Sequence, residues 1–149
     1  MGGGNSANEK EAKRNAPDSS FEANEDIMFM RVSPNNRVIA IGSCNEIRLY
    51  NPLDNSFIKQ LEGSCFQKCG VAISTCAFSP DSKYLAYRWD DKVRVYNLES
   101  ESSEKDIKLD DGQSARTISF SPDGQRILVG CHYDHIQIYT MNADSSQSF

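Results

Sequence analysis

The sequence predicts an all-β fold built from repeated antiparallel units, and two observations lead to this prediction. Three similar segments each hold a Ser-Pro pair followed by a run of apolar residues: 29–42, 76–87 and 118–130. A second similar segment follows each of them at nearly constant distance: 47–51, 93–97 and 136–140. The Ser-Pro pairs begin at residues 33, 79 and 121, so the repeat periods are 46 and 42 residues. No helical periodicity occurs in this region, and the apolar patterns are typical of strands.

Each repeat is predicted to be a four-stranded antiparallel meander whose first hairpin is set by the Ser-Pro turn. In that turn Pro fixes φ for a type I turn, and the Asp or Asn that follows can accept a hydrogen bond from its own backbone. The Gly or Asn after it tolerates the left-handed conformation. The second strand, at 38–41, 84–87 or 127–129, is almost continuously apolar. Such a run favours a strand that is covered on both faces.

The third and fourth strands follow from the second half of each repeat. Ile47 and Leu49 flank Arg48, and the same alternation recurs in residues 93–95, so one face of the third strand is expected to be buried. Weaker fourth strands are predicted over 57–61 and 106–109. The third repeat has no candidate for a fourth strand.

These repeats resemble the blades of WD-repeat β-propellers, which have a period of about 40 to 45 residues and four strands each. The resemblance covers residues 27–140 and depends on the Ser-Pro turn followed by two β runs. The repeats are degenerate, because the family's terminal Trp-Asp is replaced by Tyr50-Asn51, Tyr96-Asn97 and Tyr139-Thr140 and its Gly-His is absent. The family's hydrogen-bonded tetrad therefore cannot form as such.

The resemblance implies an all-β, partial β-propeller of about three four-stranded antiparallel blades. The expected blades span residues 27–61, 72–109 and 115–140. They are flanked by a flexible leader at 1–26 and a disordered tail at 141–149, both of which are mostly polar.

Three blades are fewer than a closed ring needs, since closed propellers have about 4 to 8. Three blades leave two apolar faces open, and such faces are binding sites or aggregation liabilities. Four arrangements would account for this. In the first, the chain is a fragment of a larger propeller, and in the second, two copies form a six-bladed ring. In the third, the chain completes a partner's incomplete propeller, and in the fourth, the open form is stable by itself.

Composition and charge exclude several classes of function. The net charge of -5 and pI near 5.0 do not suit a nucleic-acid-binding protein, which needs a concentrated basic face. No apolar run approaches the roughly 20 residues of a membrane span, and no secretory core follows Met1. A cytoplasmic location is therefore expected, and reducing conditions there would keep the five cysteines as thiols.

The first six residues match the pattern for N-myristoylation, with Gly2 after the initiator Met and Ser6 at the sixth position. The alternative is an unmodified leader. One myristoyl chain gives only marginal membrane binding, with an association constant of about 10⁴ M⁻¹. A second signal is missing, because no Cys precedes Cys44 and acidic residues outnumber basic ones in residues 9–26. We therefore expect weak, reversible membrane contact if Gly2 is acylated.

No catalytic, cofactor or metal site is predicted. Six candidate zinc ligands fall in loops that an antiparallel meander brings to one rim: Cys44, Cys65, Cys69, Cys131, His132 and His135. Their spacing does not give the close ligand pairs of structural zinc sites. The remaining cysteine, Cys76, belongs to a strand and is expected in the core. Both histidines lie in one turn, and no Gly-x-Ser-x-Gly motif is present.

The resemblance implies a non-enzymatic protein-interaction scaffold or adaptor. Its partners would be other proteins, or further copies of the chain that complete the propeller. The alternative is a fragment of a larger propeller-containing enzyme whose catalytic residues lie outside this chain, because fold alone does not establish function.

Overall fold

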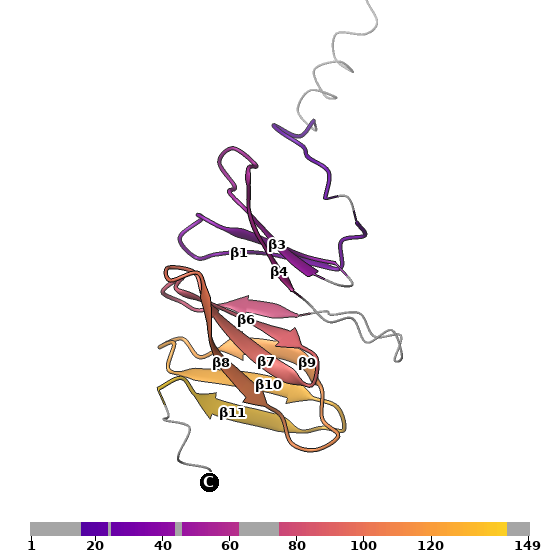
Figure 1. The fold of residues 1–149 in the computed structure, drawn as a ribbon, viewed down its shortest axis with the longest axis vertical. Helices are drawn as coiled ribbons and strands as arrows, with labels where there is room; N and C mark the ends of the chain where they lie inside the picture. Colours follow the sequence, from indigo (N-terminus) through magenta and orange to yellow (C-terminus); the bar gives the residue numbers. More distant parts are fainter. Residues whose placement is uncertain (1–15, 24, 44–45, 63–74, 143–149) are drawn as a thin grey trace, which may run out of the picture.

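The computed structural model describes residues 16–23, 25–43, 46–62 and 75–142 of the 149-residue chain (Figure 1). All regular secondary structure in this part of the chain is β-strand, which confirms the all-β prediction. The strands are β1 (Phe29–Val32), β2 (Ile39–Gly42), β3 (Glu46–Tyr50), β4 (Phe57–Glu62), β5 (Cys76–Phe78), β6 (Tyr84–Trp89), β7 (Lys92–Asn97), β8 (Ser102–Lys108), β9 (Ala115–Phe120), β10 (Arg126–Cys131) and β11 (Ile136–Thr140).

The strands form three antiparallel sheets, each with its strands in chain order. The first sheet holds β1 to β4, the second β5 to β8, and the third β9 to β11. Among the described residues no strand pairs with the outer edge of β11, so the third sheet has three strands, in agreement with the lack of a fourth-strand candidate in its sequence repeat. The fourth strand of the second sheet begins at Ser102, earlier than predicted. The first residues of β8 are polar and pair with β7 through backbone hydrogen bonds, which need no apolar side chain. The apolar pattern of the sequence therefore did not indicate where this strand begins.

The three sheets stack face to face in chain order (Figure 1). The first strands of the sheets lie side by side, because β5 contacts both β1 and β9. One hydrophobic cluster fills the space between the first and second sheets, and another fills the space between the second and third. This is the radial stacking of propeller blades.

Both faces of the middle sheet are buried, which differs from the expectation of one buried face on each alternating strand. In β7 the side chains of Val93 and Val95 belong to the cluster shared with the third sheet. Tyr96, one position further on, belongs to the cluster shared with the first sheet. The physical reason is that successive side chains point to opposite faces, and this sheet has a neighbour on each.

Ser79 shows the hydrogen bonds that define each Ser-Pro turn. Its Oγ donates to Oδ1 of Asp81 (2.6 Å) and accepts from the backbone N of Tyr84 (2.9 Å). Asp81 Oδ1 also accepts from the backbone N of Lys83 (3.0 Å). Ser82 takes the left-handed position with φ +62°. The same bonds recur in the turns that begin at Ser33 and Ser121, where Asn36 and Gly124 have positive φ.

Polar contacts between sheets repeat as well. Lys59 Nζ on β4 donates to the backbone O of Glu101 in the second sheet (3.4 Å). Lys105 Nζ on β8 donates in the same way to the backbone O of Thr140 in the third sheet (3.2 Å). The outer strand of each four-stranded sheet therefore holds the sheet that follows it.

Replacing Ser79 with Ala is expected to lower the free energy of unfolding by about 1 to 2 kcal/mol, because it removes two hydrogen bonds at a buried position. Ser121→Ala is the matched control, since its hydroxyl makes the equivalent bonds in a more exposed turn where water can replace them. Urea denaturation of both variants measures the difference. Equal losses in the two variants would contradict the role assigned to burial of the turn.

Candidate interaction surfaces

Each sheet has two faces that are defined by the order of the stack. We call the face toward the following sheet the trailing face and the face toward the preceding sheet the leading face. In the second sheet, Val93 and Val95 lie on the trailing face, whereas Cys76, Tyr87 and Tyr96 lie on the leading face. The first sheet has a free leading face and the third sheet a free trailing face.

The free leading face of the first sheet contains large apolar side chains. By strand register its apolar side chains are those of Met30, Val32, Ile39, Ile41 and Tyr50, and Arg48 lies on the same face. Met30 is 55% exposed, whereas Cys76 and Ile118, which hold the same position in the next two sheets, are 2% and 5% exposed. The position is thus a core position wherever a preceding sheet covers it.

Residues before β1 lie over part of this leading face. The ring of Phe21 contacts the ring of Tyr50 with centroids 4.9 Å apart. Ser19 Oγ accepts a hydrogen bond from Nδ2 of Asn55 (3.1 Å). Tyr50 is consequently buried although it lies on a free face, whereas Met30 remains exposed. This partial cover was not foreseen from the sequence, where residues 1–26 were treated as one leader.

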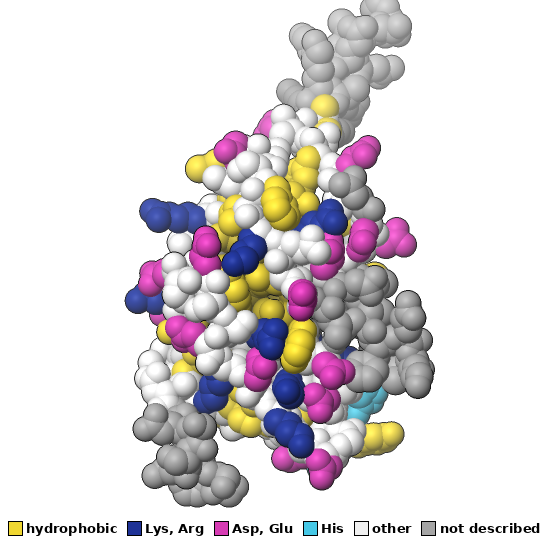
Figure 2. Space-filling view, in the orientation of Figure 1, with side chains coloured by type: hydrophobic (Ala, Val, Ile, Leu, Met, Phe, Trp, Pro, Cys, Tyr) yellow, Lys and Arg dark blue, Asp and Glu magenta, His cyan; other side chains and the backbone are white. Residues whose placement is uncertain are grey.

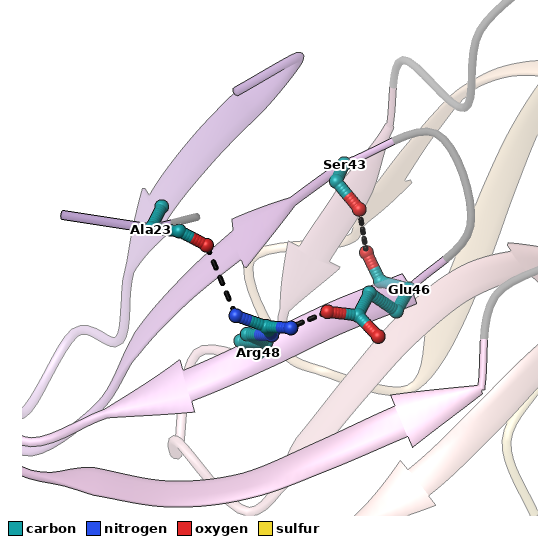
Figure 3. A network of polar contacts seen from close by, with 4 residues as sticks. All are labelled: Ala23, Ser43, Glu46 and Arg48. Carbon is teal, nitrogen blue, oxygen red and sulfur yellow. Dashed lines mark hydrogen bonds and ion pairs between the residues drawn. The ribbon is translucent and has the colours of Figure 1, made fainter. Parts of the chain in front are cut away.

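Arg48 is the polar anchor of this cover (Figure 3). Its NH1 donates to the backbone O of Ala23 (3.0 Å), and its guanidinium pairs with the carboxylate of Glu46 on the same strand. A hydrogen bond with Tyr50, opposed by desolvation and supported by the charge of Glu46, raises the pKa of Arg48 above its ordinary value. A pocket beside it has a free volume of about 10 Å³, room for about one water molecule. It is too small for a substrate.

The free trailing face of the third sheet contains Leu128, Ile136 and Ile138, which adjoin through the β10–β11 register. Ile136 and Ile138 are 72% and 58% exposed. Val93 and Val95, at the same positions of the second sheet, are completely buried. This face is therefore a propeller interface without its following blade among the described residues.

Trp89 and Arg94 lie on the leading face of the second sheet. The Arg94 guanidinium is 3.8 Å from the ring centroid of Trp89 and donates two hydrogen bonds to Asp106 (2.8 and 2.9 Å). These bonds lower the pKa of Asp106. The arrangement ties β6, β7 and β8 together, which is a structural role. Trp89 is the last residue of β6, and Asp90 follows it in the turn.

The candidate zinc ligands that lie among the described residues do not form a metal site. Cys44, Cys65 and Cys69 lie outside the described residues, as does Gly2. Cys131 ends β10, and His132 contacts the guanidinium of Arg116 at 2.9 Å. In the part of the chain that the structure describes, no three His, Cys, Asp or Glu side chains are placed to hold a metal ion.

Cys76 lies in the core, as the sequence predicted. Burial raises the pKa of its thiol to about 12, so the group stays protonated at neutral pH. A protonated thiol is a weak nucleophile. Cys76 therefore belongs to the packing between the first and second sheets.

On the face drawn in Figure 2, Lys and Arg side chains alternate with Asp and Glu. Phosphate binding needs a concentrated basic surface, and this face does not provide one. None of the described residues forms a helix that is long and apolar enough to span a membrane.

The comparisons with known proteins agree with this geometry. The family model "WD domain, G-beta repeat" matches residues 55–97, which include β4 of the first sheet and β5 to β7 of the second. No curated protein sequence matches the chain.

Two solved structures share the fold. The β-propeller domain of Myceliophteria thermophila Cps50 (Swd1) has a TM-score of 0.71 and 11% identity, covering 85% of this chain and 39% of that one. Kuenenia stuttgartiensis hydrazine synthase has a TM-score of 0.64 and 18% identity, covering 85% of this chain and 36% of that one. The chain thus spans less than half the length of either structure, and these low identities show the fold alone. These comparisons therefore show a β-propeller fold, within which residues 55–97 match a WD repeat.

Proposed function

We propose that this chain is a non-enzymatic protein-interaction scaffold of the WD-repeat type that acts in the cytoplasm. The WD-repeat match and the propeller neighbours support a role of this kind, because such propellers are typically interaction modules. The observation that carries the proposal is the exposure of Met30, Ile136 and Ile138 at positions that are buried elsewhere in the stack. Exposed apolar patches of this kind mark protein-binding surfaces.

A second candidate function has one observation in its favour. One structural neighbour, hydrazine synthase, has the name of an enzyme, and this chain covers 36% of it. On this reading the chain is part of a larger propeller-containing enzyme whose catalytic residues lie elsewhere. The scaffold proposal is preferred because the free faces expose apolar side chains at positions that are buried elsewhere in the stack.

The scaffold proposal predicts contacts with other proteins at specific surfaces. A photo-crosslinking amino acid would be placed at Met30 and Ile138, on the two free faces, and at Leu53 and Tyr133, two highly exposed side chains in turns. Lys108, an exposed position in a paired strand, is the matched control. In cells, proteins other than this chain should crosslink at one or more of the four positions and not at the control. Labelling at all five positions alike, or at none, would contradict the proposal.

Myristoylation of Gly2 is proposed as the source of reversible membrane contact. Co-expression with an N-myristoyltransferase should add the mass of one myristoyl group to the chain, and Gly2→Ala should remove it. Because one acyl chain binds membranes only marginally, the acylated protein should sediment only in part with neutral vesicles. An intact mass without the acyl group would refute this part of the proposal.

A further inference from the structure

The two free faces are the two halves of one repeated interface. Each contact between neighbouring sheets joins a trailing face to a leading face, and the structure contains this contact twice. In both cases the trailing face offers two aliphatic side chains of the third strand, Ile47 and Leu49 or Val93 and Val95. All four of these side chains are essentially inaccessible to solvent.

The leading face in these contacts is equally regular. It offers an apolar residue of the first strand, Cys76 or Ile118, and apolar residues of the second strand such as Leu85 or Ile127. The third strand adds a tyrosine, which is Tyr96 in the second sheet. A sheet that fits the free trailing face must therefore present this same set of positions.

The free leading face of the first sheet presents that set. Met30 stands at the position of Cys76, Ile39 at the position of Leu85, and Tyr50 at the position of Tyr96. The free trailing face presents Ile136 and Ile138 at the positions of the buried aliphatic pairs. The two ends of the stack are thus complementary to each other and not to themselves.

We propose that two copies of this chain close into a ring of six sheets. This deepens the scaffold proposal, because it makes a second copy the partner at the two free faces and leaves the turns that carry Leu53 and Tyr133 for other proteins. The trailing face of the third sheet in each copy packs on the leading face of the first sheet in the other, so both contacts are identical and related by a two-fold axis. Six sheets lie within the range of about 4 to 8 in which propellers close. Closure continues the packing already present between the sheets of one chain and buries the exposed side chains of Met30, Ile136 and Ile138.

Ring closure requires the segment around Phe21 to leave the leading face. This segment lies over Tyr50, where the third sheet of the other copy would pack. Its described contacts with the first sheet include the Phe21 ring on Tyr50, the hydrogen bond from Asn55 to Ser19 and the hydrogen bond from Arg48 to Ala23.

The test is the solution mass of the full 149-residue chain as a function of concentration. We expect a dimer of twice the 16.7 kDa chain mass. Met30→Glu and Ile138→Glu should each weaken dimerisation by at least about 10-fold, because each places an unpaired carboxylate in an apolar contact. Leu53→Glu and Tyr133→Glu, highly exposed and outside both faces, are the matched controls and should leave the dimer intact. A monomeric wild-type chain at all concentrations would overturn the proposal.

A mixing experiment distinguishes this ring from other dimers and shows that the variants are folded. Met30→Glu keeps an intact trailing face and Ile138→Glu keeps an intact leading face, so an equimolar mixture should form a heterodimer through one native contact. Each variant alone should remain monomeric in the same concentration range. Homodimers of either variant, or a mixture that stays monomeric, would overturn the pairing of leading with trailing faces.

The affinity of the dimer also tests whether the segment around Phe21 must leave the leading face. Phe21→Ala removes the ring contact with Tyr50 and should tighten the dimer several-fold, because less must be displaced. A dimer of unchanged or lower affinity would show that the segment does not compete for the face.

Discussion

The structure depends on one constraint: each four-stranded sheet has two apolar faces, and both must be covered. Side chains in a strand alternate between faces, and in β7 the aliphatic and the aromatic positions are both buried. A sheet of this kind buries the apolar side chains of both faces only where it has a neighbour on each side. The middle sheet satisfies this condition, because clusters cover it on both sides.

The Ser-Pro turns make this stacking regular. In each turn the serine hydroxyl and the Asp or Asn after Pro bind backbone groups, and the next residue takes a left-handed conformation. Neighbouring turns also touch, since the backbone N of Asn35 donates to Oγ of Ser82 (3.0 Å). The turns thereby fix the strand register, and register decides which side chains reach each face. The family's Trp-Asp and Gly-His residues are absent, and these turns provide an equivalent regularity by other bonds.

The same constraint explains the two ends of the stack. The first sheet has recruited Phe21 and its neighbours over Tyr50, which gives part of the cover that a preceding sheet would give. Among the described residues nothing comparable lies over Ile136 and Ile138. The apolar surface that supports the proposed binding function thus consists of positions that a neighbouring sheet covers elsewhere in the stack.

The sequence by itself determined the repeats, the strands and the Ser-Pro turns, because these depend on local periodicity and on hydrogen bonds between residues a few positions apart. It also indicated the apolar faces and the core position of Cys76. Only the tertiary structure decided which of two alternating side chains faces which neighbour, so the burial of Tyr96 together with Val95 was not foreseen. The cover over the first sheet was missed for the same reason: Arg48 and Ala23 are 25 residues apart, and Phe21 lies in a polar stretch with no periodic pattern. Contacts of that kind depend on which surface the finished stack leaves exposed.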